Sequence, residues 1–191
     1  NDTLKLLKNG QKLVANQGYA FIDFGTTTNK VLVKVSLSSA NCEGAAANLD
    51  KELSHWSFDK VKREAKQQWK RILSRTKAEG ANKEEMRVFY TALYHAYLAP
   101  YLFSDAHGNY KGPDGEIHSV GKANQYTVFS LWDTFRAAHP LFTITQKTRV
   151  NDMIKSFIRH YEAHDLLPNW ELMGNESHCM IGNHAIPIIT E

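Results

Sequence analysis

The period of the hydrophobic pattern changes along the chain, and this change constrains the fold more than any other feature. Residues 31–37 place valine or leucine at every second position, which is typical of a half-buried strand. Residues 20–24 are a second candidate strand, and Gly25 and Asn29 fit a turn between the two. From about Ser57 the apolar residues recur every three or four positions, as on one face of a helix. The pattern therefore predicts strands first and helices afterwards.

Three helices are expected after this change. The first begins near Ser57 and is expected to end at Gly80. Asn82 lies three residues before Glu85, which predicts the N-cap of a second helix, and Pro100 is expected to stop it. An aromatic stripe on this second helix, best explained as core packing, is made of Met86, Phe89, Tyr90, Leu93, Tyr94 and Tyr97. The third helix carries an apolar face made of Val150, Met153, Ile154, Phe157, Ile158 and Tyr161.

Three other segments are less regular. Residues 38–50 are small and polar, and we interpret them as a connector. Residues 104–126 contain many glycines, which predicts a long loop with room for a small hairpin. Residues 184–191 are apolar and end without a helix cap, so we expect the chain to be incomplete at this end.

The composition is that of a soluble globular protein, with 42% hydrophobic and 23% charged residues. The net charge is only +3, and the densest basic group, within residues 60–71, alternates with apolar positions at helical spacing. Because no stacking aromatics accompany these charges, we expect a solvated helix face rather than a nucleic-acid site. No apolar run is long enough to predict a membrane span. Cys42 and Cys179 match neither a disulfide framework nor a zinc spacing.

The segment from Ser130 to Pro140 concentrates chemistry suited to a sugar. If it is helical, Asp133 and Arg136 share one face, beside Trp132. A carboxylate accepts hydrogen bonds from adjacent hydroxyls, a guanidinium donates to ring substituents, and an indole covers an apolar sugar face. The alternative is a salt bridge between Asp133 and Arg136 at a packed helix end, with Trp132 in the core. Pro140 is expected to end the segment.

A second polar segment spans residues 167–184 and is expected to be a turn-rich loop. Its candidate site residues are Trp170, Glu171, Glu176, His178 and His184. From these residues alone, Glu171 and Glu176 would be the candidates for an acid–base pair. The alternatives are a polar loop anchored by Trp170, or a zinc site formed by Glu176 and the two histidines. Asn175 also begins a weak N-glycosylation pattern.

Five blocks, in this order along the chain, carry a family resemblance. They are FYTALYHAYLAPYLFSD, YKGPDGEIHSV, SLWDTFRAAHPLFT, LPNWEL and GNESHCMIGNHA. Together they resemble glycoside hydrolase family 92, the calcium-dependent exo-acting α-mannosidases, over roughly residues 15–191. The resemblance implies an α+β chain that contains the end of an N-terminal β-sandwich with a connector (1–50), a linker helix (51–80) and the first part of an (α/α)6 helical barrel (81–191).

The resemblance also implies an activity: release of terminal α-linked mannose, with α-1,2 the expected linkage, from mannan or N-glycan chains with inversion. It places the general acid, the general base and the main calcium ligands downstream of Glu191, so this chain alone is expected to be inactive. The substrate-binding residues expected here are Trp132, Asp133, Arg136, Trp170, Glu171, Glu176, His178 and His184. None of these is expected to bind metal, since the resemblance places the main calcium ligands downstream. A zinc site at Glu176, His178 and His184 is not favoured, because the resemblance implies calcium, which prefers oxygen to imidazole. The expected location is periplasmic, cell-surface or secreted. The alternatives are a non-catalytic glycan-binding fragment and another (α/α)6-barrel enzyme that acts on carbohydrates.

Overall fold

The computed structural model describes residues 19, 21–26, 30–80 and 82–191, and it divides into a unit of residues 1–32 and a unit of residues 33–191. In the first unit, the described residues form neither helix nor strand. The strand predicted at 20–24 is therefore not found at residues 21–24, while position 20 and Asn29 lie outside the described residues. Gly25 has a φ of +63° and donates its N–H to Asp23 Oδ1 at 2.7 Å. A local turn thus follows the predicted strand.

The second unit begins with an extended segment that does not pair as a strand. The alternation predicted for residues 31–37 is present in residues 33–37, but its apolar side is exposed. Val33, Val35 and Leu37 are 68%, 73% and 82% exposed, whereas Lys34 and Ser36 are partly buried. No described strand forms hydrogen bonds with this segment. The strand prediction was therefore wrong here, because alternation specifies a face but not the neighbour that a strand needs.

Helix α1 (Cys42–Glu52) occupies the region that we interpreted as a connector. Asn41 caps it by accepting the Gly44 N–H at 2.8 Å. Gly44 is buried, and a Cβ at this position would overlap the Asp105 carboxylate. The alanines that suggested a connector instead have high helix propensity. The prediction therefore missed a helix that packs closely against the loop of residues 104–109.

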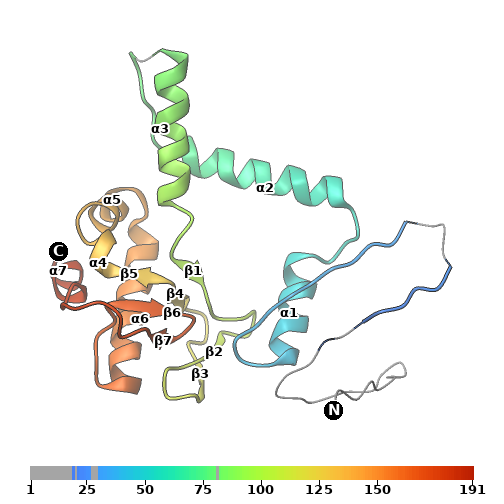
Figure 1. The fold of residues 1–191 in the computed structure, drawn as a ribbon. Coiled ribbons are helices and arrows are strands. Elements are labelled where there is room, and N and C mark those ends of the chain that lie inside the picture. The colour runs from blue at the N-terminus through green and yellow to red at the C-terminus, as the bar shows by residue number, and fades with distance from the viewer. Residues whose placement is uncertain (1–18, 20, 27–29, 81) are drawn as a thin grey trace. The chain divides into compact units, whose positions relative to one another are not determined.

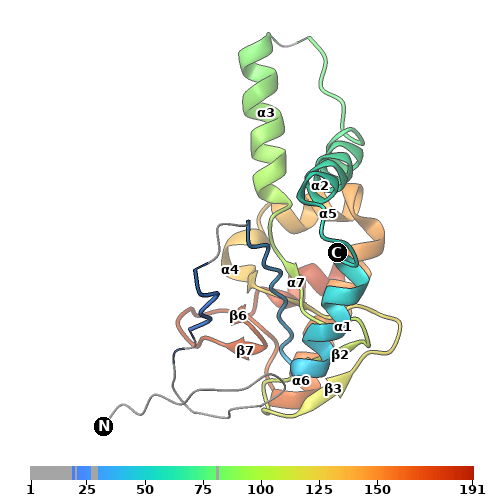
Figure 2. The ribbon, with the colours of Figure 1, turned by 90° about the vertical axis from the view of Figure 1, so that its right-hand side faces the viewer.

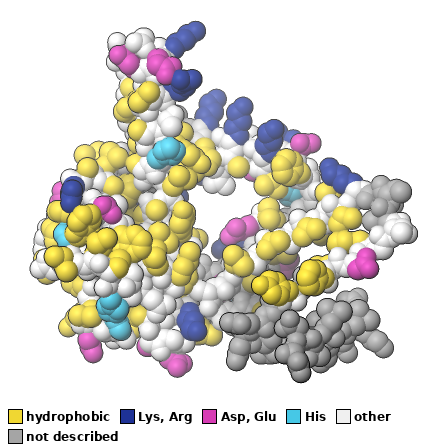
Figure 3. All heavy atoms as spheres, in the orientation of Figure 1, with side chains coloured by type: hydrophobic (Ala, Val, Ile, Leu, Met, Phe, Trp, Pro, Cys, Tyr) yellow, Lys and Arg dark blue, Asp and Glu magenta, His cyan; other side chains and the backbone are white. Residues whose placement is uncertain are grey.

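Helices α2 (Phe58–Leu73) and α3 (Lys83–Ala96) confirm the predicted period and start sites. Asn82 and Glu85 form a complete capping box. Helix α2 ends at Leu73, well before Gly80, and it has no buried residue. Lys and Arg side chains line its exposed side (Figure 3). Of the predicted core stripe, Leu93 is buried and Phe89 is exposed, while the other members are partly buried, so the prediction is confirmed in part.

Two short antiparallel pairs follow α3. Strand β1 (Tyr101–Leu102) pairs with β4 (Tyr126–Thr127), and β2 (Asn109–Lys111) pairs with β3 (Ile117–Ser119). The β2–β3 pair confirms a hairpin within residues 104–126. Asp105 orders its start by accepting the N–H groups of His107 and Asn109, each at 2.9 Å.

The main core lies among four helices: α4 (Leu131–Thr134), α5 (Ala138–Thr145), α6 (Lys147–His164) and α7 (Ala185–Thr190). Its most buried side chains include Leu131, Phe142, Phe157 and Ile188. Helix α6 confirms the third predicted helix. We had expected Pro140 to end the preceding segment. It lies instead in the first turn of α5, where proline is tolerated.

A three-stranded antiparallel sheet packs on this core. Strand β6 (Trp170–Leu172) lies between β5 (Phe129–Ser130) and β7 (Asn175–Glu176). Phe129 of β5 packs edge-on against Phe157 of α6, with ring centroids 4.7 Å apart. Strands β6 and β7 lie side by side in both views (Figures 1 and 2). The predicted polar loop thus contains a hairpin.

The hairpin turn consists of Met173 and Gly174, with φ values of 50° and 89°. Two positive φ angles are typical of the tight turns that match strand twist. Overall the described chain is α+β, as predicted. None of its described helices combines the length and the apolar composition needed to cross a bilayer.

Candidate functional site

The fold brings the two predicted polar segments into direct contact. Ser130 of β5 lies opposite Trp170 of β6, and the Leu131 N–H donates to the Asn169 carbonyl at 2.9 Å. The start of the segment from Ser130 to Pro140 is therefore joined to the start of the segment of residues 167–184 by backbone hydrogen bonds.

Asp133 lies on the short helix α4 with its carboxylate exposed. Its Oδ2 accepts a hydrogen bond from Ser130 Oγ. We had expected Asp133 and Arg136 to share one face if this segment is helical. The chain leaves helical geometry between α4 and α5, so the two residues do not lie on one continuous helix. Within the described residues no salt bridge joins them, so the salt-bridge alternative lacks its central contact. Asp133 is thus an anchored but accessible acceptor.

Aromatic rings hold Arg136 in place instead. Its guanidinium carbon lies 5.2 Å from the Trp132 ring centroid and 5.6 Å from that of Phe135. Phe135 also packs against His184, with centroids 4.6 Å apart. We call these four residues, Trp132, Phe135, Arg136 and His184, the aromatic–arginine cluster. It contains members of both predicted segments, and Phe135 was missed because only its neighbours carry polar chemistry.

Glu171 is buried, with 3% of its surface exposed. Its carboxylate accepts from the Thr127 hydroxyl at 2.7 Å, from the Val128 N–H at 3.0 Å and from the Gly174 N–H. Burial raises the pKa of Glu171 to about 7. The three hydrogen bonds lower this pKa, but their effect is smaller than that of burial. The three donors come from β4, the residue before β5 and the β6–β7 turn. The carboxylate therefore joins three parts of the sheet region.

Glu176 has a similar structural position at the other end of the hairpin. Its carboxylate accepts the N–H groups of Asn169 at 2.7 Å, Trp170 at 3.1 Å and His178 at 3.3 Å. A carboxylate occupied by backbone amides is poorly placed to exchange protons with a substrate. The geometry therefore favours structural roles for both Glu171 and Glu176.

Asn169 is a second residue that the sequence analysis missed. It is 6% exposed, and its side chain contacts the carbonyls of Met180 and Ile181 and the ring of His184. Its only sequence signal is its place inside the LPNWEL block. Asn169 thus connects the hairpin to the segment that leads into α7.

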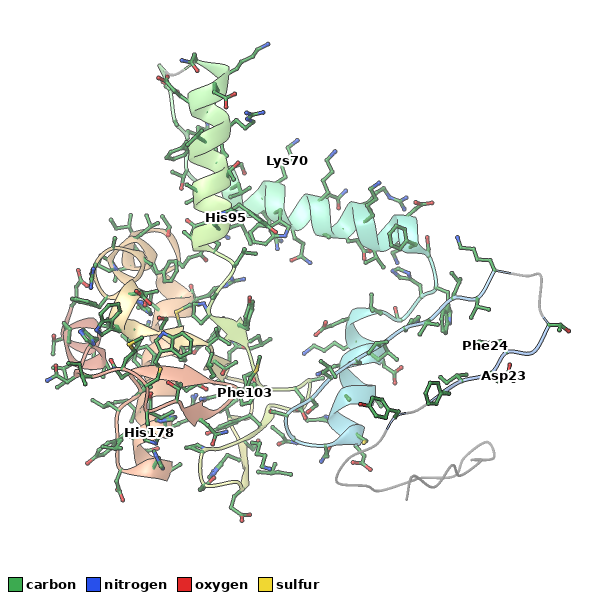
Figure 4. All side chains as sticks on the ribbon, viewed as in Figure 1. Asp23, Phe24, Lys70, His95, Phe103 and His178 are labelled. Carbon is green, nitrogen blue, oxygen red and sulfur yellow. The ribbon has the colours of Figure 1, made fainter. Side chains whose placement is uncertain are left out.

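His178 contacts this network only through its backbone N–H, which donates to Glu176. His178 is exposed, and its ring lies 5.8 Å from that of His164 at the end of α6 (Figure 4). Among the described residues no group of three or more His, Cys, Asp or Glu side chains could hold a metal ion. Since Glu171 and Glu176 are occupied by other donors, the described residues do not fit a calcium site. We assign no chemical step to calcium on these residues.

Comparisons with known proteins place this geometry in a family. Residues 44–191 match the glycosyl hydrolase family 92 catalytic domain. A family 92 α-mannosidase from Bacteroides thetaiotaomicron is 37% identical, with a TM-score of 0.75 over 79% of this chain and 20% of that chain. The family 92 inverting mannosidase from Bacteroides thetaiotaomicron VPI-5482 is 32% identical, with a TM-score of 0.71 over 80% of this chain and 21% of that chain.

One curated relative also matches. An uncharacterized secreted glycosidase from Arthroderma benhamiae is 31% identical over 87 residues, which are 42% of this chain and 11% of that protein. The chain spans about a fifth of the length of its solved relatives and less of this one. Because the family match extends over most of the sequence, from residue 44 to residue 191, the chain belongs to glycosyl hydrolase family 92.

Proposed function

We propose that this chain forms one wall of the terminal sugar site of an exo-acting α-mannosidase. The exposed Asp133 carboxylate beside the aromatic–arginine cluster carries the proposal. The carboxylate can accept hydrogen bonds from two adjacent sugar hydroxyls. The guanidinium of Arg136, held by two aromatic rings, keeps its N–H groups available for further ring oxygens. Trp170 enters this site through the backbone pairing of β5 with β6.

The relatives support α-linked mannose as the substrate class. The solved relatives are described as mannosidases, one was solved with mannoimidazole bound, and another is described as inverting. We extend inversion and an α-1,2 linkage in mannan or N-glycan chains to this protein as part of the proposal. A periplasmic, cell-surface or secreted location is also proposed, in keeping with the secreted fungal relative.

Inversion requires a general acid and a general base roughly 6.5–9.5 Å apart, with room for a water molecule. Glu171 and Glu176 do not suit these roles, since backbone donors occupy both. We propose that the acid, the base and the calcium ligands lie in barrel segments of the full-length protein that follow Glu191. The residues described here would then bind and orient the sugar, and this chain alone would not hydrolyse it.

The test is Asp133→Asn in the full-length protein, assayed on α-1,2-, α-1,3- and α-1,6-linked mannobiose. We expect kcat/KM on the preferred linkage to fall about 100-fold, because one charged acceptor of two hydroxyls is lost. The melting temperature should stay within a few degrees. Asp165→Asn is the matched control, because Asp165 is an exposed aspartate at the end of α6 in left-handed conformation, which asparagine tolerates.

Normal turnover in Asp133→Asn would refute the site assignment. Mannose binding without turnover in the unsubstituted full-length protein would instead indicate a glycan-binding protein. Turnover only on glucans or uronic acid polymers would indicate a different (α/α)6-barrel enzyme.

A further inference from the structure

The side-chain amide of Asn169 has only one orientation that satisfies its surroundings. Its Nδ2 lies 3.0 Å from the carbonyl oxygens of both Met180 and Ile181. Both amide hydrogens are donated there, and a flipped amide would place an oxygen against two carbonyl oxygens. Asn169 Oδ1 therefore faces His184 Nδ1, at 2.8 Å, as a hydrogen-bond acceptor.

The orientation of the amide decides which ring nitrogen of His184 carries hydrogen. An amide oxygen can only accept, so Nδ1 must donate and must be protonated. In a neutral imidazole the hydrogen then lies on Nδ1, and Nε2 keeps a lone pair. No described residue forms a hydrogen bond with Nε2, and His184 is partly exposed. Nε2 is therefore a free acceptor with a fixed tautomer.

The position of Asn169 is itself constrained. Its backbone N–H donates to the Glu176 carboxylate, and its carbonyl accepts from the Leu131 N–H. With the two bonds from its amide hydrogens, nearly every polar group of this 6% exposed residue is bonded. Asn169 is thus a rigid partner for the imidazole.

The His184 ring is also held from two sides. Phe135 packs against it, with centroids 4.6 Å apart and ring planes at 39°. Gly182 adjoins the ring at a φ of +117°, and a Cβ at this position would overlap the imidazole. These contacts and the Asn169 bond fix the direction of the Nε2 lone pair, on the aromatic–arginine cluster that we assign to the sugar site.

We propose that Asn169 locks His184 in its Nδ1–H tautomer, so that His184 Nε2 accepts a hydrogen bond from a hydroxyl of the terminal sugar. This inference rests on the proposed function of the site. Asn169 is a positioning residue, because it acts through His184. Within the site, Nε2 would be a neutral acceptor that complements the charged acceptor Asp133. Two charged groups contact the residues that hold His184. The Arg136 guanidinium lies over the Phe135 ring, and the Glu176 carboxylate accepts the Asn169 N–H.

Two variants of His184 in the full-length protein separate the roles of its ring nitrogens. His184→Asn keeps an amide donor near the Nδ1 position but loses the acceptor at Nε2. His184→Gln reaches the Nε2 position and can present an acceptor there. We expect KM for α-1,2-linked mannobiose to rise about tenfold in His184→Asn and less than threefold in His184→Gln. The reverse order would show that His184 only anchors Asn169 and would overturn the proposal.

Asn169→Asp adds a pH test. The new carboxylate still accepts from Nδ1 but favours the imidazolium, in which Nε2 carries a hydrogen and cannot accept. Its second oxygen also replaces the Nδ2 donor opposite the Met180 and Ile181 carbonyls, so the variant should lose stability at every pH, and the test is the change of KM with pH. We expect a raised KM near pH 6 that approaches the unsubstituted value near pH 9, as the imidazolium loses its proton. Gln125→Glu, a buried amide replaced outside the cluster, is the control for a general effect of added charge.

A loss in Asn169→Asp that is equal at both pH values would overturn the tautomer assignment. These outcomes are distinct from failure of the proposed function. If the unsubstituted full-length protein neither binds nor cleaves mannosides, the function itself fails. If it is active but His184→Asn has normal KM, only this inference fails.

Discussion

Helices α1–α3 and the region from β4 to α7 differ in how much of their structure depends on contacts that are distant in sequence. Helix α2 has a clear apolar period and side-chain capping, yet none of its residues is buried. In the β4–α7 region the strands are only two or three residues long, yet they pack on a continuous core and contain a buried carboxylate. Local signals thus suffice to form a helix, whereas burial depends on partners that are distant in sequence.

The comparison can be tested with identical residue types, because glutamate, histidine and glycine occur in both regions in different surroundings. Glu171, His139 and Gly174 are buried or tightly packed in the β4–α7 region. Helix α3 and the loop between α2 and α3 offer exposed counterparts at Glu84, His95 and Gly80. If burial determines the effect, the same substitution should have unequal effects in the two regions.

The largest difference is expected for glutamate. Glu171→Gln replaces one acceptor oxygen with an NH2 group that must face a backbone N–H, so we expect a loss of about 3 kcal/mol in unfolding free energy near pH 5. The loss should be smaller at pH 8, where ionisation of the buried Glu171 already destabilises the unsubstituted protein. Glu84→Gln, at a side chain that is 66% exposed and paired with Arg87, should cost less than about 0.5 kcal/mol. Thermal melting of both full-length variants checks this. Equal shifts would show that the Glu171 network contributes no more than a surface pair.

The same contrast explains which parts of the structure could be predicted. The apolar period of α2, α3 and α6, and the N-caps of α2 and α3, depend on neighbours within a few residues, and these helices were found. The strand at residues 31–37 was not confirmed, because alternation does not identify a pairing partner. In the site, the polar residues were nominated by type. The roles of Asn169 and Phe135 depend on their contacts with His184, which is distant in sequence, so no local sequence pattern predicts them.

The next largest effect is expected for histidine and depends on pH. His139 is 2% exposed, and burial lowers its pKa from 6.5 to about 4. A base with a lowered folded-state pKa contributes stability above pH 6.5 that is lost as the pH falls towards 4. His139→Phe should therefore remove about 1 to 2 kcal/mol of destabilisation at pH 5. His95→Phe, at an exposed histidine, is the matched control.

Two other groups shape this pH profile. Burial also lowers the pKa of His160 to about 4, so part of the acid sensitivity should remain in His139→Phe. Glu171 acts in the opposite direction, since its raised pKa of about 7 makes stability fall as the pH rises from about 4.5 to 7. Melting temperatures between pH 4.5 and 8 separate these contributions. An unchanged pH profile in His139→Phe would contradict the assignment.

Glycine offers a closer match between the regions, because Gly174 and Gly80 have nearly the same φ, +89° and +81°. A Cβ at Gly174 would stand 2.7 Å from the Lys111 carbonyl oxygen, whereas a Cβ at Gly80 meets no described atom within 4 Å. Backbone strain alone should cost about 1 kcal/mol in either alanine variant. Gly174→Ala should lose about 1 kcal/mol more than Gly80→Ala, measured as melting temperature. Equal losses would show that the turn relaxes freely.

The smallest effect is expected for the capping box of α3, which is the best-defined local structure in helices α1–α3. Asn82 accepts the N–H groups of Glu84 and Glu85, and the Glu85 carboxylate accepts the Asn82 N–H. Asn82→Ala should cost about 1 kcal/mol of helix stability, whereas Asn82→Ser, which retains the cap, should cost little. Hydrogen exchange at the first turn of α3 is the sensitive measurement, because a helix with only Leu93 fully buried can open locally without global unfolding. Unchanged exchange in Asn82→Ala would mean that tertiary packing, rather than the cap, holds this helix end. Helix α3 would then depend on distant contacts, as the β4–α7 region does, although most of its residues are exposed or only partly buried.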